Sequence, residues 1–273
     1  MTSALTWRLV ERYRRQTLTR HRIRTKRQAL RFVDTLGFCY AFTAGPGHLP
    51  GLFDVLATRS IDRMWSWAWQ WKDELATERC LFYGKVLRRK PTYVALAFLP
   101  QFFALSGNAG EPDDYLQAYR EGRLSRLARD VYEYVRAHGP CSTWVLRRQF
   151  VTRGDRGSAF HRALGDLQGR FLLAKAGELE EGSYSFIWDT FDRWMPQVVR
   201  AAHRISTADA GAAVLDRYLQ TVGAIAPGVV TDLFHWPPRI LQEARRSLED
   251  RIMDGQIDHA SVGTHAEFQR WRS

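Results

Sequence analysis

Cysteine is scarce in this chain of 273 residues, which has only Cys39, Cys80 and Cys141. The three are isolated, form no Cys-x-x-Cys pair and have no histidine at ligand spacing. A disulfide framework or a structural zinc site is therefore not expected, and a reducing cytoplasm fits this usage best. Glycine-rich phosphate loops and a Ser-His-Asp order are also missing, so we expect no metal and no small-molecule cofactor.

Long hydrophobic runs are missing as well. No stretch approaches the roughly 18 apolar residues that a membrane span requires. The basic N-terminus lacks the apolar segment of a secretory signal. We therefore expect no membrane partner. With 45% hydrophobic and 13% aromatic residues, the chain is nonetheless too apolar to be disordered throughout.

Acidic residues are few relative to basic ones: 29 Asp and Glu stand against 40 Lys and Arg, for a net charge of +11 and a pI near 9.9. This balance favours a polyanionic partner, either nucleic acid or an anionic membrane surface. Almost all the basic residues are arginine, which suits bidentate contacts with phosphate and guanine. A GC-rich genome would also explain the arginine-to-lysine ratio, but it would not explain clustering.

The basic residues cluster at the N-terminus, where the first forty residues contain only Glu11 and Asp34 as acids. The basic members are Arg8, Arg12, Arg14, Arg15, Arg20, Arg22, Arg24, Lys26, Arg27 and Arg31. Phosphate contacts release counterions, so such a segment predicts salt-sensitive, sequence-independent binding to DNA or RNA. A solvated basic face without a partner, or a membrane surface, is the alternative.

A repeated helical plan is the most informative pattern. Residues 126–191 read as three helices followed by two strands, and residues 209–268 as helix, short helix, Pro-Pro turn, helix and a closing strand. Three helices followed by a hairpin are typical of the winged helix. We predict a mainly α protein with small β-hairpins and tandem winged helices. The expected domains are a basic helical region with a possible degenerate winged helix (1–107), a central winged helix (108–200) and a C-terminal winged-helix-like domain (201–273).

The third helix of a winged helix commonly enters the DNA major groove, and we expect one of the two copies to bind DNA in this way while the other has a structural or interaction role. In the central copy it spans 157–169, and its outer face carries Ser158, Arg162, Gly165 and Gly169, which suits close approach to DNA or to another protein domain. In the last copy it spans 239–254 with alternating charges, which favours a structural role. The acidic tip of the central wing (Glu178, Glu180, Glu181) is not expected to hold phosphate. The predicted DNA contacts are Arg162, Arg156, Arg147, Arg148, Arg22, Arg24, Lys26 and Arg27.

Several segments resemble the AlkZ-related branch of bacterial winged-helix proteins, relatives of the AlkZ/YcaQ DNA glycosylases. They are Trp69–Leu75, Phe82–Lys85, Lys90–Thr92, Asp113–Tyr115, Leu164–Leu173 and Trp188–Trp194. The resemblance covers residues 25–196 and implies tandem winged helices and duplex DNA as the partner, in the cytoplasm on the nucleoid. It also implies a possible role in DNA repair, because those glycosylases excise alkylated bases and unhook crosslinks.

The chain departs from that family where the glycosylases carry their catalytic polar element, Gln-x-Gln or Gln-x-Asp after Leu-Gly. Here Leu36-Gly37 is followed by Phe38, Cys39, Tyr40, Ala41 and Phe42. The resemblance therefore implies DNA binding without the family's base excision. A divergent glycosylase, with Asp73 or Tyr40 as a weak catalytic candidate and a Trp-lined pocket, is the alternative. So is a winged-helix protein-interaction module. We expect Trp65 and Trp69 to be core residues and Asp73 to cap its helix or pair with Lys72.

Overall fold

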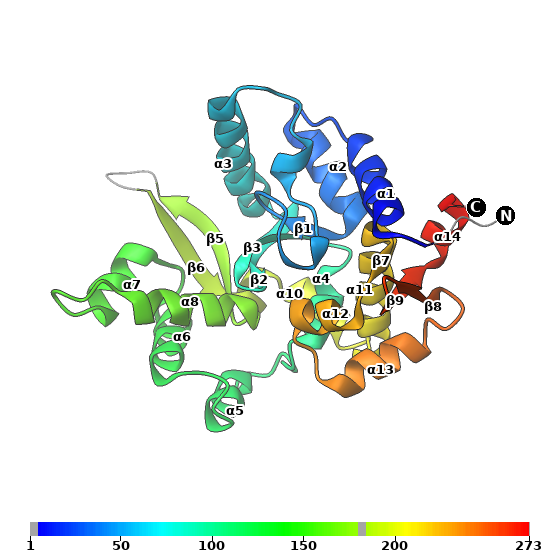
Figure 1. The fold of residues 1–273 in the computed structure, drawn as a ribbon. Helices are drawn as coiled ribbons and strands as arrows, with labels where there is room; N and C mark the ends of the chain where they lie inside the picture. The colour runs from blue at the N-terminus through cyan, green and yellow to red at the C-terminus, as the bar shows by residue number, and fades with distance from the viewer. Residues whose placement is uncertain (1–4, 180–183, 273) are drawn as a thin grey trace.

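Three units with the same order of elements build the chain in the computed structural model, which describes residues 5–179 and 184–272 (Figure 1). Each unit consists of a helix, a short strand, further helical turns and a β-hairpin. In each, the short first strand pairs with the last strand, giving three antiparallel sheets of order β1-β3-β2, β4-β6-β5 and β7-β9-β8. This shared order is a property of the tertiary structure that the strand pattern alone did not show.

The N-terminal unit comprises residues 26–95. It contains α2 (Lys26–Leu36), β1 (Phe38–Tyr40), η1 (Pro46–His48), η2 (Leu52–Val55), α3 (Ile61–Thr77), β2 (Leu81–Leu87) and β3 (Lys90–Ala95), and α1 (Trp7–Thr19) precedes it. The side chain of Thr25 caps α2 by accepting from Gln28 N, and Gly37 ends it with φ of 77°. The sequence predicts a short helix over residues 49–57, but the structure has only the 3₁₀ turn η2 there, because the backbone is extended on both sides of it.

The central unit comprises residues 126–190. It contains α6 (Arg126–His138), β4 (Cys141–Ser142), α7 (Thr143–Phe150), α8 (Ser158–Gly169), β5 (Leu173–Leu179) and β6 (Ser185–Thr190). Two short helices, α4 (Leu99–Leu105) and α5 (Asp114–Arg120), connect it to the N-terminal unit. The sequence offers Ser142 or Thr143 as the cap of the second helix in this unit, and it is the Ser142 side chain that caps α7, by accepting from Val145 N. Strand β5 packs against α3, so the central and N-terminal units are in contact.

The C-terminal unit comprises residues 207–265. It contains α11 (Thr207–Val222), β7 (Ala224–Ile225), α12 (Pro227–Phe234), α13 (Pro238–Arg246), β8 (Ile252–Ile257) and β9 (Ala260–His265). It follows α9 (Phe191–Trp194) and α10 (Pro196–Ala202), and α14 (Ala266–Arg272) ends the described chain. The prediction of a third helix over 239–254 was wrong at its end. The chain turns after Arg246, and Ile252 lies in a strand because β8 completes a hairpin with β9.

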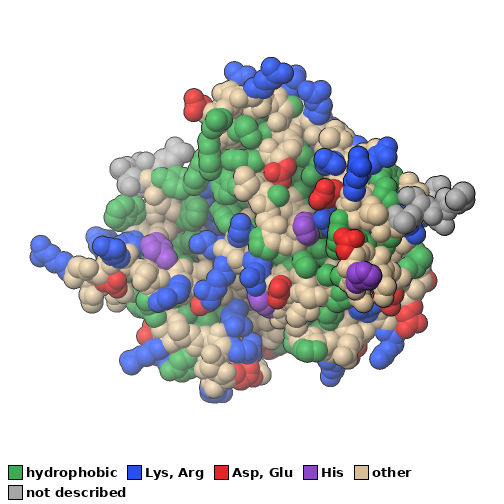
Figure 2. All heavy atoms as spheres, in the orientation of Figure 1, with side chains coloured by type: hydrophobic (Ala, Val, Ile, Leu, Met, Phe, Trp, Pro, Cys, Tyr) green, Lys and Arg blue, Asp and Glu red, His purple; other side chains and the backbone are tan. Residues whose placement is uncertain are grey.

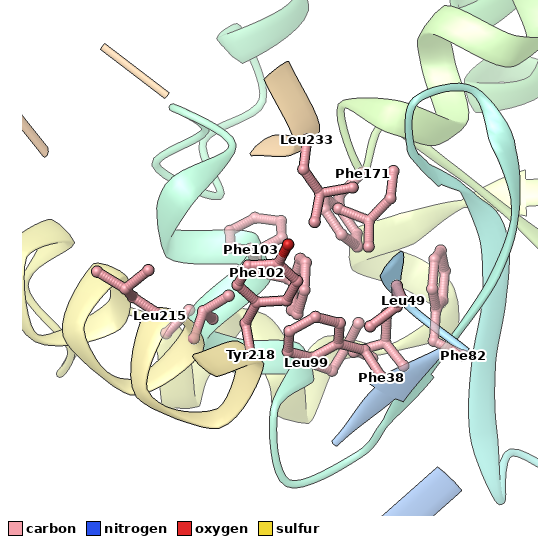
Figure 3. Packing of buried hydrophobic residues seen from close by; sticks show 14 of the residues in the cluster. Phe38, Leu49, Phe82, Leu99, Phe102, Phe103, Phe171, Leu215, Tyr218 and Leu233 are labelled. Carbon is pink, nitrogen blue, oxygen red and sulfur yellow. The ribbon is translucent and has the colours of Figure 1, made fainter. Parts of the chain in front are cut away.

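One hydrophobic core joins all three units (Figure 3). Phe38 and Phe82 come from the N-terminal unit, Phe171 follows α8 of the central unit, and Tyr218 and Leu233 belong to the C-terminal unit. Helix α4 lies among them and also packs against α11 and α10. Since no unit buries these side chains alone, the units are held in a fixed arrangement.

Candidate nucleic-acid interface

A basic cleft of about 590 Å³ lies where the three units meet. We define it by Lys85, Arg88 and Arg89 of the β2–β3 hairpin, Arg170 after α8, and His235 after α12. Figure 2 shows Lys and Arg side chains gathered across the centre of this face, over the β2–β3 hairpin and the end of α8. The positive charge of the cleft comes from the β2–β3 hairpin and from Arg170, which lies 81 positions after Arg89 in the sequence.

The turn between β2 and β3 points two arginines toward this cleft. Arg88 and Arg89 have φ of 50° and 56°, the left-handed conformation required at both central residues of a tight type I′ hairpin. Arg88 Nη1 donates to the carbonyl of Asp232 at 3.1 Å and lies 2.9 Å from Nε2 of His235. Arg89 pairs with Asp166 of α8 at 2.7 Å. The hairpin tip is thereby tied to both other units.

Helix α8 is only half available to a ligand. Ser158 and Arg162 are exposed in its first half. In its second half Gly165 is buried, and a side chain at Gly169 would approach the carbonyl oxygen of Lys85 to 3.3 Å. Of the two uses expected for this face, packing on another part of the protein is the one observed at the glycines. Only the Arg162 end remains free to approach DNA.

The other predicted arginines of the central unit lie near Arg162. Nη1 of Arg147 on α7 is 2.9 Å from Nε2 of His161 on α8. Arg148 and Arg156 are exposed, on α7 and in the loop before α8. These residues form a second basic area beside the exposed half of α8.

The N-terminal basic cluster is divided by the fold. Arg22 and Arg24 line a separate hollow of about 610 Å³ with Arg59, and Arg27 is exposed. Lys26, a predicted DNA contact, instead binds two acids that sequence proximity did not reveal, Glu74 at 2.8 Å and Glu78 at 2.7 Å. These hydrogen bonds raise the pKa of Lys26 above its ordinary value.

A further arginine of that cluster is part of the fold itself. Arg14 donates from Nε to the carbonyl of Val222 and from Nη2 to that of Ala224, at 2.8 and 2.7 Å. It thus satisfies carbonyls at the end of α11. Arg14 is therefore not part of an exposed basic surface, while binding of nucleic acid by the exposed arginines of the N-terminus stays a prediction.

Tyr40, one of the two weak catalytic candidates, is a core residue. Its side chain is 1% exposed, and burial raises its pKa to about 12. The hydroxyl donates to the carbonyl of Pro46 at 3.2 Å. Phe38, Cys39 and Ala41 are also buried, so the segment where the glycosylases carry polar side chains is an apolar part of the core.

Asp73, the other candidate, is the centre of an ion cluster between α3 and the β5–β6 hairpin, which we define as Lys72, Asp73, Lys175, Glu178 and Tyr184. Asp73 accepts from Lys175 at 2.7 Å and from the Tyr184 hydroxyl at 2.7 Å, and pairs with Lys72 at 2.8 Å. The side chains of both lysines are fully buried. Burial raises the pKa of Asp73, but the hydrogen bonds from the lysines outweigh it and the pKa lies below the ordinary value.

The predicted pairing of Asp73 with Lys72 is confirmed, whereas Lys175, Glu178 and Tyr184 were missed. Glu178 binds Lys175 at 2.7 Å rather than standing free at the wing tip. Glu180 and Glu181, the other predicted tip acids, lie outside the described residues. Lys175 is a single lysine between apolar residues of a strand. This pattern is the signal in the sequence that could have indicated a buried carboxylate as its partner.

The expectation that Trp65 and Trp69 are core residues is wrong. Their side chains are 45% and 44% exposed, respectively, on one face of α3. Trp71 and Ala68, on the opposite face, are the buried ones. The helix is long and carries tryptophans on both faces, so sequence spacing alone did not indicate which face is covered.

Within 5–179 and 184–272, no group of three or more His, Cys, Asp or Glu side chains is placed to hold a metal ion. In the same part of the chain, no helix has the length and apolarity needed to cross a membrane.

Comparison with known proteins agrees with this architecture. The AlkZ-related family matches residues 23–235, most of the chain and beyond the range of the resemblance seen in the sequence. The fold is similar to that of the Streptomyces sahachiroi DNA glycosylase AlkZ, with a TM-score of 0.62 and 14% identity over 99% of this chain and 72% of that one. No curated protein matches by sequence. The chain is a member of the AlkZ-related family.

Proposed function

We propose that this protein binds duplex DNA across the basic cleft and that its three units act as winged helices. The observation that carries the proposal is the convergence of Lys85, Arg88, Arg89 and Arg170 where the three units meet. Membership of the AlkZ-related family and a fold similar to that of a DNA glycosylase support DNA as the polyanion. We place this activity in the cytoplasm, on the nucleoid.

The chemistry of the cleft suits a phosphate backbone. Guanidinium groups bind phosphate oxygens in a fixed, bidentate geometry, and each neutralised phosphate releases counterions. The exposed half of α8, with Arg162, extends this surface to the central unit. In this arrangement Arg88 and Lys85 contact the backbone and set the register, while Arg162 is the candidate for contact with a base edge.

We further propose that the protein binds DNA without excising bases. Glycosidic cleavage requires a group that positions water beside the sugar cation. The β1 segment offers only buried apolar side chains and the Tyr40 hydroxyl, which a backbone carbonyl already engages. Asp54 lies nearby, but its Oδ2 accepts from Gly51 N and Ala44 N. Asp73 is held by two lysines and a tyrosine, which leaves it poorly placed as a base.

The test is a fluorescence anisotropy titration of the whole protein with a labelled duplex at several salt concentrations. The logarithm of affinity should fall linearly with the logarithm of salt, by about 0.9 for each phosphate neutralised. Arg88→Ala should weaken binding and make that slope shallower by about 0.9, because one phosphate contact is lost. Arg126→Ala is the matched control, because Arg126 is exposed on α6, lies 3.8 Å from Asp130 in an ion pair and is not among the residues that line the cleft. No binding at low salt, or equal effects of both variants, would contradict the proposal.

A further inference from the structure

Large aromatic side chains are exposed together on the face formed by α3, β6 and α7. Trp65, Trp69, Tyr184 and Trp144 are 45%, 44%, 45% and 51% exposed. The Trp65 and Trp69 rings both contact Phe42, at 5.8 Å, and the Trp69 ring lies 6.1 Å from the Tyr184 ring. Figure 2 shows hydrophobic side chains exposed along α3 and toward β6. We call these four residues the aromatic surface.

Two rings of the aromatic surface, those of Trp69 and Tyr184, contact Lys72 of the ion cluster. Lys72 Nζ lies 4.1 Å from the centre of the Trp69 ring and donates to the Tyr184 hydroxyl at 2.6 Å. Asp73 accepts from the same hydroxyl. Exposed aromatic rings ordinarily lose rotational freedom when they bind a ligand. Here that freedom is already restricted, because buried charges fix the rings before any ligand arrives.

The surroundings favour an anionic ligand with flat rings. Trp144, Arg147, Tyr184 and Phe186 line a hollow of about 360 Å³. Arg147 contacts His161 on α8, so this hollow borders the exposed half of the helix that leads to the basic cleft. The nearby acids Asp73 and Glu178 are already bound by Lys72 and Lys175. An apolar protein partner could pack against the rings, but it would form no ion pair with the arginine beside them, whereas a nucleic acid would use both.

We propose that the aromatic surface stacks unpaired nucleobases of DNA whose duplex portion lies in the basic cleft. This inference rests on the proposed function and deepens it: the favoured substrate is a duplex interrupted by a short unpaired stretch. The phosphates of that stretch contact Arg147 and neighbouring arginines, and its bases lie on Trp69, Trp65 and Tyr184. Such stacking tolerates any base, because every base has a flat π face.

The experiment compares two labelled DNAs by anisotropy: a fully paired duplex, and the same duplex with a central loop of unpaired thymidines. The whole protein should bind the looped DNA at least about fivefold more tightly. Trp69→Leu keeps the apolar bulk but removes the ring, and should weaken binding to looped DNA roughly five- to hundredfold while leaving the paired duplex unchanged. Trp69→Phe keeps a ring and should retain most of the preference. Met253→Ala removes an exposed apolar side chain of the C-terminal unit and should change neither affinity.

The outcomes separate this inference from the proposed function. Salt-sensitive duplex binding with no preference of the wild type for the looped DNA would contradict the stacking surface and leave the proposal for the cleft unaffected. A Trp69→Leu variant equal to the wild type on looped DNA would do the same and point to a protein partner. If the wild type bound neither the paired nor the looped DNA, both the stacking surface and the DNA-binding cleft would be contradicted. The wild-type loop preference is measured without any variant, so misfolding of Trp69→Leu does not remove the test.

Discussion

Replacing Asp73 by alanine should strongly destabilise the protein. Asp73 is the shared partner of Lys72 and Lys175, whose side chains are fully buried at 2.8 and 2.7 Å from its carboxylate. Removing one member of a buried ion pair leaves an uncompensated charge and typically costs about 3–5 kcal/mol. Lys175 keeps Glu178 as a partner, so Lys72 is the charge left without compensation.

The magnitude has an upper limit that follows from titration. Burial and the nearby Lys175 lower the pKa of Lys72, to about 8 even with Asp73 present. Without Asp73, Lys72 can escape the penalty by losing its proton. Because the pKa of Lys72 is about 8 with Asp73 in place, its neutral form lies only about 1.4 kcal/mol above its charged form at pH 7, so the Lys72 part of the cost is limited to about that value. The hydrogen bonds that Lys175 and Tyr184 donate to the Asp73 carboxylate are also lost, at about 1.5–3 kcal/mol. We therefore expect a total loss of about 3–4 kcal/mol.

The assay is urea denaturation followed by far-UV circular dichroism. With a slope of about 3 kcal/mol per molar urea for a chain of this size, the midpoint should fall by ~1–2 M. The double variant Asp73→Ala/Lys72→Met should be more stable than Asp73→Ala alone, because methionine fills the same space without a charge. Glu74→Ala is the matched control: Glu74 is the next residue but makes an exposed ion pair with Lys26, so its loss should matter far less.

The reasoning would be refuted if Asp73→Ala and Glu74→Ala had the same midpoint, or if Lys72→Met worsened the effect of Asp73→Ala. Either result would mean that the buried lysines do not depend on Asp73. If Asp73→Ala does not fold, Asp73→Asn supplies the same comparison, because it keeps the shape and removes the charge.

Four further measurements follow. Arg162→Ala should weaken duplex binding by about 1–3 kcal/mol if it reads a base edge, and more than Arg246→Ala on the charge-balanced α13; equal small effects in anisotropy would place neither in a groove. The protein should release no 7-methylguanine from an oligonucleotide, scored by alkaline cleavage, and strand breaks that vanish in Asp73→Asn would make it a glycosylase. Gly37→Ala should lower stability by about 1–3 kcal/mol in thermal denaturation, because φ is 77° and the added carbon would approach a phenylalanine ring to 2.8 Å; an unchanged midpoint would contradict this. Because the pKa of Lys72 is lowered from 10.5 to about 8, the unfolded chain binds more protons between these values, so the stability of the wild type relative to Lys72→Met should rise from pH 8 to pH 10; a flat difference would exclude this linkage.

Local patterns in the sequence were sufficient to predict most individual elements. The Thr25 side chain caps the start of α2, and Gly37, which has a positive φ, ends the helix. The apolar run of residues 81–87 forms strand β2, and α8 begins at Ser158, one residue after the predicted start at 157. These features depend on neighbours a few residues apart, so the sequence contains the information directly. The AlkZ-related resemblance was also readable from short segments and is confirmed over residues 23–235.

The tertiary structure decided which surfaces those elements expose. The spacing of Leu241, Ala244 and Leu248 continues to Ile252 as if in one helix, yet pairing with β9 makes Ile252 part of a strand. The glycines of α8 would allow close approach of either DNA or a neighbouring unit. In the structure they face Lys85 of β2, so the neighbouring unit occupies this side of the helix.

The ion cluster shows why the sequence alone did not predict which side chains are buried together. Lys175 and Asp73 are 102 positions apart, and the free energy of bringing them together comes from the core that packs α3 against β5. A buried lysine needs a carboxylate, but neither residue reveals its partner along the chain. Sequence alone determined most of the helices, the hairpin of the central unit and the excess of positive charge. Only the packing of three units determined the C-terminal hairpin, where the positive charge converges, which tryptophans remain exposed and which acids are neutralised.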